Sequence, residues 1–215
     1  MYSPSPRLSA WLMLIETLLA TTVHAASLPQ REYAQVLRSK PDIVHGETLF
    51  ETCAACHGPQ GAGIADGTVP AIAGQHFHII ARQLVEYRHD KRWDLRMNHF
   101  TDQHHLGGAQ DIADLAAFIS KLTVSEATDH GSGEYLRHGG EVYAHLCASC
   151  HGAAGEGGDR ERYPRLAGQH YDYLLRQMHD GLEGRRPNFP PSHVRLLQRV
   201  ERVDLAGLAD YLSRL

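Results

Sequence analysis

The chain has 215 residues, four cysteines and a formal net charge of −4 with its 16 histidines counted as neutral. A mildly acidic protein is not attracted to phosphate backbones, so we expect no nucleic-acid partner and favour a partner with a basic docking surface. A chain of this length has room for two small domains, each with a limited hydrophobic core.

The first 25 residues have the layout of a secretion signal. Arg7 precedes an apolar run over residues 8–19, and small residues surround Ala25. The run contains Glu16 and is shorter than the roughly 20 residues that a membrane-spanning helix needs. We therefore predict a cleaved signal peptide over residues 1–25, a periplasmic location, and no transmembrane segment in the mature chain.

The four cysteines occur in two pentapeptides of one pattern. Residues 53–57 read Cys-Ala-Ala-Cys-His, and residues 147–151 read Cys-Ala-Ser-Cys-His. This pattern is the attachment site of a c-type haem, in which two thiols bond to the porphyrin and the histidine reaches the iron. Zinc sites usually bring cysteine pairs closer in sequence, thioredoxin motifs need a βαβ setting, and C-x-x-C disulfides close very small loops. We predict two covalently bound haem c groups.

Both haem motifs belong to an internal repeat with an offset of 94 residues, as from Cys53 to Cys147. Near the end of each half the offset falls to 93. The matched pairs include Gly46 with Gly140, Pro70 with Pro164, residues 72–76 with residues 166–170, and residues 111–115 with residues 204–208. Such self-similarity indicates a duplicated domain. With a polar joint at about residues 123–133, we predict domains over residues 26–125 and 126–215.

Apolar spacing makes each half helical. One predicted helix per half has apolar residues on a single face: Phe77, Ile80, Leu84 and Tyr87 in the first half, and Tyr171, Leu174, Leu175 and Met178 in the second. The last helix of each half begins near Asp111 or Asp204, where a carboxylate can cap the helix and oppose its dipole. No segment alternates as a strand would. We predict an all-α fold with three to four short helices per half.

Both halves resemble class I cytochrome c domains, and their tandem arrangement resembles the dihaem cytochrome c4 family. The residues that carry this resemblance are the two haem motifs, the Ala-Gly-Gln-His stretches at residues 73–76 and 167–170, and the repeated start of the last helix. The resemblance covers about residues 46–122 and 139–215. It implies one haem in each of two tandem domains, and electron transfer with respiratory partners such as a terminal oxidase or a periplasmic or membrane-bound dehydrogenase.

The resemblance also implies roles for individual residues. It implies haem thioethers at Cys53, Cys56, Cys147 and Cys150, proximal iron ligands at His57 and His151, and candidate propionate partners at Arg92 and Arg186. The carbonyl groups of Pro70 and Pro164 would accept hydrogen bonds from the two proximal imidazoles and so fix their orientation.

The sixth iron ligand departs from the family pattern. The family places a methionine in the loop before the last helix, where the first half has Met97 but the second half has none. Met178 falls on the apolar face of a helix and fits packing better. His193 lies at the expected position of the second half and repeats as His99 of the first. The second haem therefore takes His193 or is five-coordinate, and the first takes either Met97 or His99.

Two functions follow from these alternatives. The leading prediction is a periplasmic carrier that passes electrons between respiratory partners, with peripheral association with a membrane left open. The alternative is a dihaem oxidoreductase that acts on a small sulfur or nitrogen oxyanion at an open or displaceable haem site. No serine, cysteine or carboxylate catalytic set is recognisable in the sequence, which favours the carrier over the enzyme.

Overall fold

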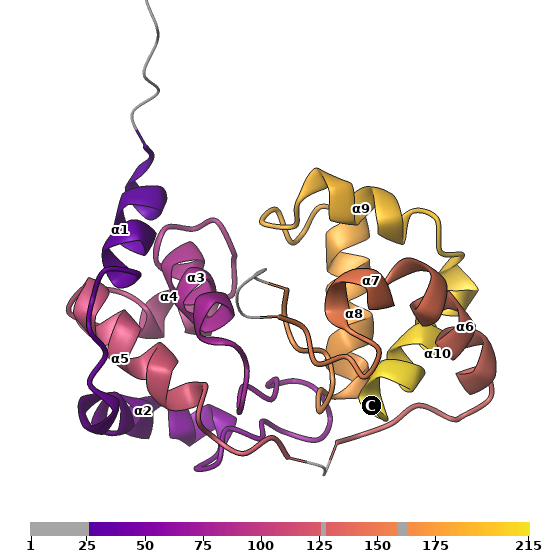
Figure 1. Ribbon diagram of the computed structural model, residues 1–215, viewed down its shortest axis with the longest axis horizontal. Helices are drawn as coiled ribbons and strands as arrows, with labels where there is room; N and C mark the ends of the chain where they lie inside the picture. The colour runs from indigo at the N-terminus through magenta and orange to yellow at the C-terminus, as the bar shows by residue number, and fades with distance from the viewer. Residues whose placement is uncertain (1–25, 126–127, 159–162) are drawn as a thin grey trace, which may run out of the picture.

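Two helical lobes make up the structure, a computed structural model that describes residues 26–125, 128–158 and 163–215 (Figure 1). The first lobe consists of α1 (Leu28–Val36), α2 (Ile43–His57), α3 (Phe77–Arg88), α4 (Leu95–Phe100) and α5 (Ala109–Ile119). The second lobe consists of α6 (Leu136–Leu146), α7 (Ala148–His151), α8 (Tyr171–Leu182), α9 (Pro191–Leu197) and α10 (Arg202–Ser213). Within the described ranges the only β pairing is one bridge, between Gly158 and Tyr163. The predicted all-α fold is confirmed.

Two further predictions concern export and membranes. The predicted signal peptide over residues 1–25 lies outside the described residues. None of the helices in the described part of the chain is both long enough and apolar enough to cross a bilayer.

The predicted apolar helix faces form the cores of the two lobes. In the first lobe α5 packs against α2 and α3, and its residues Ile112 and Leu115 are fully buried. In the second lobe α10 packs against α6 and α8, and Leu205 and Leu208 are equally inaccessible. Each lobe thus has three longer helices in its core and five helices in all within the described residues, where three to four were predicted.

The helix α1 precedes the repeat and was not predicted. It packs on α3 and α5, and Val36 at its end is fully buried in the core of the first lobe. Glu32 of α1 forms ion pairs with Arg88 and His89 at the end of α3. These contacts extend the first lobe beyond the repeated unit.

A glycine lies where α2 crosses α5 in the first lobe, and another lies where α6 crosses α10 in the second. A Cβ atom on Gly46 would lie 2.2 Å from the Asp114 carbonyl oxygen, and one on Gly139 would lie 2.0 Å from the Gly207 carbonyl oxygen. The sequence repeat pairs Gly46 with Gly140, whereas in the structure Gly139 occupies the position equivalent to Gly46. The cause is at the haem motif: α2 is continuous, whereas its counterpart is interrupted at Cys147 between α6 and α7.

Replacing Gly46 by alanine is expected to lower the free energy of unfolding by about 1–3 kcal/mol, because the new methyl group forces α2 and α5 apart. Chemical denaturation of the haem-loaded protein measures the change. Gly108→Ala is the control for an added methyl group, since a Cβ there meets no atom within 4 Å and the change should cost about 1 kcal/mol or less, through the cap position of α5. Equal stability of both variants would contradict this close crossing.

A buried carboxylate on the last helix of each lobe holds a preceding segment of chain. Asp114 of α5 accepts a hydrogen bond from the Asp42 backbone N–H at 2.7 Å, at the start of α2. Asp210 of α10 accepts from the backbone N–H groups of Gly131 and Gly133 at 3.1 and 2.6 Å. The connection between the lobes is therefore attached to the core of the second lobe.

The aspartates predicted at the starts of the last helices are each the third residue of the helix. Asp111 and Asp204 are in the first turns of α5 and α10, while the cap positions belong to Gly108 and Glu201. Both carboxylates can therefore oppose the helix dipole, but they do not occupy the cap positions.

The two lobes exchange a symmetric set of hydrogen bonds through the Gln-His pairs of the repeat. The Gln75 side chain bonds to both the backbone N–H and C=O of Arg165, each at 2.9 Å. The Gln169 side chain bonds in the same way to Ala71, at 3.0 and 2.8 Å. The adjacent histidines follow the same rule: His76 contacts the Glu156 carbonyl and His170 the Ala62 carbonyl, both at 2.8 Å. We call these contacts the glutamine clasp.

Candidate functional site

Both haem motifs lie at the end of a helix. α2 ends at His57 and α7 at His151, and the following residues, Gly58 and Gly152, have φ angles of 77° and 82°. Only glycine adopts such angles without strain, so the helix stops directly after the histidine. In α2 the two cysteines and the histidine are spaced i, i+3 and i+4, which places them on one helix face.

Each motif histidine is oriented by a proline carbonyl. His57 Nδ1 lies 2.9 Å from the Pro70 oxygen, and His151 Nδ1 lies 2.9 Å from the Pro164 oxygen. A carbonyl can only accept, so Nδ1 must donate, and Nε2 of the neutral ring keeps a free lone pair. Burial lowers the pKa of both histidines, which favours that neutral form. The predicted proline contacts are confirmed.

One cavity of about 680 Å³ opens between the lobes, and both motifs contribute to its wall. Apolar side chains from both lobes line much of it, including Ile72, Leu84, Leu115, Leu174 and Leu208. No disulfide joins any of the four cysteines, and burial raises the pKa of the Cys53 and Cys147 thiols to about 11. An apolar cavity with thiols and neutral imidazoles at its wall fits two covalently attached haems.

His193 of α9 lines the same cavity opposite the second motif. Its ring centre lies 6.2 Å from that of His151, with the ring planes at 73°. Its Nδ1 atom is buried and has no hydrogen-bond partner among the described residues. Burial, followed by the charges of His151 and Arg186, lowers the pKa of His193 to about 4. The ring is therefore neutral. Buried nitrogens normally have a partner, so this one suits a site where a bound group interacts with the ring.

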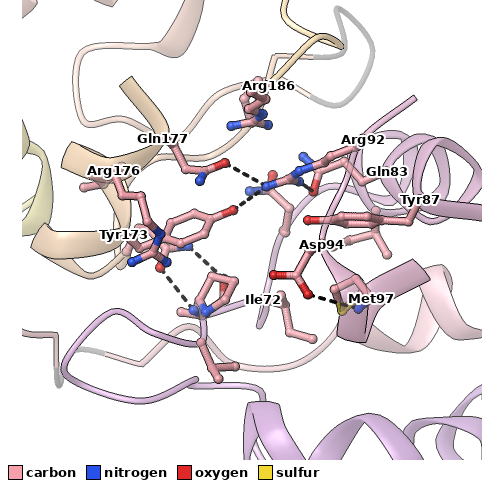
Figure 2. Close-up of a pocket in the computed structure, with 18 of the residues that line it drawn as sticks. Ile72, Gln83, Tyr87, Arg92, Asp94, Met97, Tyr173, Arg176, Gln177 and Arg186 are labelled. Atoms are coloured by element: carbon pink, nitrogen blue, oxygen red, sulfur yellow. Dashed lines mark hydrogen bonds between the residues drawn. The ribbon is translucent and has the colours of Figure 1, made fainter. Parts of the chain in front are cut away.

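Met97 lines the cavity in the first lobe. The Asp94 side chain caps α4 by accepting from the backbone N–H groups of Arg96 and Met97, at 3.0 and 3.1 Å. The Met97 side chain is half-buried, packs against the core of the first lobe and reaches the cavity (Figure 2).

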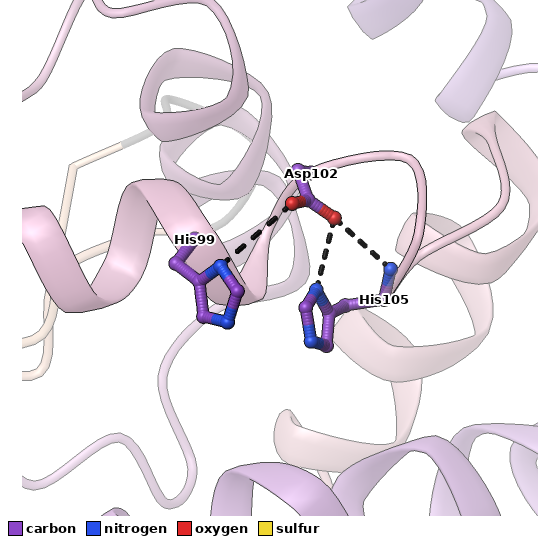
Figure 3. Close-up of side chains that lie close together, drawn as sticks. All are labelled: His99, Asp102 and His105. Atoms are coloured by element: carbon purple, nitrogen blue, oxygen red, sulfur yellow. Dashed lines mark hydrogen bonds and ion pairs between the residues drawn. The ribbon is translucent and has the colours of Figure 1, made fainter.

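His99 does not belong to the wall of this cavity. Its side chain is 61% exposed and lies in a surface group with Asp102 and His105 (Figure 3). Asp102 accepts from the backbone N–H groups of His104 and His105, at 2.8 and 3.1 Å, and lies 2.9 Å from His105 Nδ1. Asp102 therefore stabilises the turn that follows it, and this structural role accounts for the position of the three side chains.

The two predicted propionate partners lie on the cavity wall (Figure 2). Arg92 is 5% exposed and donates to Gln83 at 2.7 Å and, across the interface, to the Tyr173 hydroxyl at 2.7 Å and Gln177 at 2.9 Å. Burial and the nearby Arg92 charge lower the pKa of Arg186 to about 10. Within the described ranges neither guanidinium forms an ion pair with a carboxylate. Two such cations facing a cavity suit an anionic ligand edge.

The comparisons with known proteins agree with this site. Residues 43–123 match the family model described as cytochrome c, and residues 134–212 match the model described as cytochrome c oxidase, cbb3-type, subunit III. A cytochrome c4 from Azotobacter vinelandii is 31% identical over 191 residues, which cover 81% of this chain and 89% of that relative. The chain belongs to the cytochrome c4 family.

Solved structures agree with the cytochrome c4 assignment. Reduced recombinant cytochrome c4 from Pseudomonas stutzeri aligns with a TM-score of 0.71 and 25% identity, over 80% of this chain and 98% of that one. A thiosulfate dehydrogenase from Marichromatium purpuratum aligns with a TM-score of 0.68 and 27% identity, over 80% of this chain but 40% of that one. As a cytochrome c4, the chain binds two haem c groups covalently and is a dihaem electron carrier.

Most of the site residues predicted from the sequence come together at the cavity. The exceptions are His99, on the surface, and Cys150, which is exposed and does not contribute to the wall. Tyr173 and the glutamine clasp were not predicted from the sequence. The repeat did match Gln75 with Gln169, but a shared residue type does not reveal that each one reaches into the other half.

Proposed function

We propose that this cytochrome c4 family member is a periplasmic electron carrier whose two irons have different sixth ligands. The observation that carries the proposal is the position of His193, which faces His151 across the cavity with a buried, unpartnered nitrogen. When bound, each haem supplies a one-electron ferric/ferrous couple. The thioethers are assigned to Cys53, Cys56, Cys147 and Cys150, and the propionate contacts to Arg92 and Arg186.

The second haem is assigned the ligands His151 and His193. Both rings line the same cavity, with their centres 6.2 Å apart, so both would be able to hold the second haem. A neutral His193 ring also needs no proton removed before it can bind iron.

The first haem is assigned the ligands His57 and Met97. Met97 lines the cavity, whereas His99 is mostly exposed and interacts with Asp102. Methionine ligation raises the potential of a haem, and a second histidine lowers it. Electrons would therefore pass downhill from the second lobe to the first, so the donor docks at the second lobe and an acceptor such as a terminal oxidase at the first.

The alternative function, oxidation or reduction of a small oxyanion, needs an iron whose sixth position is open or displaceable. Its support is the structural likeness to a thiosulfate dehydrogenase. His193 lies where such an opening would be, which favours the carrier. We take the same likeness to suggest a donor that oxidises a small sulfur oxyanion.

Export and the domain boundaries complete the proposal. Residues 1–25 act as the signal, and residues 26–125 and 126–215 form the two domains. The protein purified from the periplasmic fraction should begin near Ala26. A chain recovered from the membrane fraction with residue 1 intact would overturn this part.

Low-temperature EPR and near-infrared magnetic circular dichroism on the ferric protein test the ligand assignment. We expect two low-spin signals, one typical of two histidines and one of histidine with methionine. A high-spin haem would overturn the assignment and favour the enzyme.

A further inference from the structure

The glutamine clasp contacts the same peptide groups that hold the proximal histidines. The carbonyl of the Pro70–Ala71 peptide accepts from His57 Nδ1 at 2.9 Å, and the N–H of that peptide donates to Gln169 Oε1 at 3.0 Å. One amide group thus links the proximal histidine of the first lobe to a glutamine of the second.

The second lobe repeats the arrangement in the opposite direction. The Pro164 carbonyl accepts from His151 Nδ1 at 2.9 Å, and the N–H of the same peptide, on Arg165, donates to Gln75 Oε1 at 2.9 Å. Each proximal histidine is therefore connected, through one amide, to a side chain of the other lobe.

A hydrogen bond at the N–H of an amide makes its carbonyl a stronger acceptor, because bonds in a chain polarise one another. A stronger acceptor draws the Nδ1 proton away from the imidazole and makes the ring a more basic ligand. A more basic ligand stabilises ferric iron over ferrous iron and so lowers the reduction potential.

We propose that Gln169 and Gln75 are positioning residues that each lower the reduction potential of the haem in the opposite lobe. Gln169 acts on the first haem through Pro70 and His57, and Gln75 acts on the second through Pro164 and His151. The inference rests on the proposed function in taking His57 and His151 as the proximal ligands, and its readout uses the different sixth ligands proposed for the two haems.

An amide side chain is required at these positions because both of its ends are used. The Nε2 group of Gln169 donates to the Ala71 carbonyl at 2.8 Å, and that of Gln75 donates to the Arg165 carbonyl at 2.9 Å. This second bond fixes the amide so that Oε1 faces the peptide N–H. Glutamate could accept the N–H but could not donate to the carbonyl.

Replacing Gln169 by leucine is expected to raise the potential of the first haem and leave that of the second unchanged. Gln75→Leu should do the reverse. The expected change in each ferric–ferrous equilibrium is about threefold to tenfold, where tenfold corresponds to about 59 mV for one electron. Spectroelectrochemical titration of the dihaem protein measures both potentials, because haems with different sixth ligands have different spectra.

His76→Ala is the matched control. It removes another hydrogen bond between the lobes, to the Glu156 carbonyl, without touching either proline peptide. Both potentials should stay at the wild-type values. An equal shift of both haems in Gln169→Leu, or no shift in either, would overturn the proposal.

A second variant separates the hydrogen bond from packing. Gln169→Met keeps the length of the side chain and adds no charge, but it offers the Ala71 N–H only a weak acceptor. Its first haem should therefore have the same raised potential as in Gln169→Leu. A first-haem potential equal to that of the wild type would show that packing, and not the hydrogen bond, sets the potential. Incorrect proximal ligands would instead be evident in the spectra of the wild-type protein, before any substitution.

Discussion

Replacing His193 by methionine is expected to raise the reduction potential of the second haem by on the order of 0.1 V, within the roughly 0.8 V that axial ligands span. A thioether stabilises ferrous iron more than an imidazole does. The first haem should keep its potential, since His193 lies with His151 on the second-lobe side of the cavity. Spectroelectrochemistry resolves the two couples.

His145→Met is the matched control for this substitution, because His145 is exposed on α6 and does not line the cavity. It should leave both potentials unchanged. His193→Ala provides a second readout: the second iron should lose its sixth ligand and give a high-spin ferric EPR signal. Retention of two unaltered low-spin signals in His193→Ala would show that His193 is not a ligand.

Replacing Met97 by leucine should convert the first haem to a five-coordinate, high-spin state. Leucine fills nearly the same volume as methionine, so the stability cost should be below about 1.5 kcal/mol. The change would thus come from the lost thioether ligand rather than from unfolding. The near-infrared band of methionine-ligated ferric haem should disappear, which magnetic circular dichroism detects.

His99→Leu is the matched control for Met97→Leu, since it lies two residues further along the chain and its side chain is mostly exposed. Its spectra should equal those of the wild type. The opposite pattern, a spectral change in His99→Leu and none in Met97→Leu, would assign His99 as the ligand.

The parts of the fold that local patterns determine could be predicted from sequence. The haem motifs and the long helices depend on residue spacing within a short window, and the duplication is evident because the same short patterns recur 94 residues later. The structure contains all three. The predicted pairing of Gly46 with Gly140 was wrong by one residue, because a helix interruption at Cys147 leaves no mark in the apolar pattern.

Contacts between the halves could not be predicted in this way. Spacing placed Met97 and His99 in the same loop, but only the turn of α4 determines which side chain faces the cavity. The role of Gln75 and Gln169 could not be predicted from the sequence, for a related reason. A polar residue that bonds to the backbone of a distant segment has the same local sequence as one that faces solvent.

The symmetry of the glutamine clasp has an evolutionary consequence. Each lobe presents both a Gln-His pair and the backbone that receives such a pair, so a single ancestral domain with these features would be complementary to its own copy. Two such domains would pair about a twofold axis, as most homodimers do. Gene duplication and fusion would then replace a dimer that dissociates on dilution with a pair held at an effective concentration on the order of millimolar. After fusion the two copies could diverge, and a histidine in one half with a methionine in the other is a difference that a homodimer cannot have.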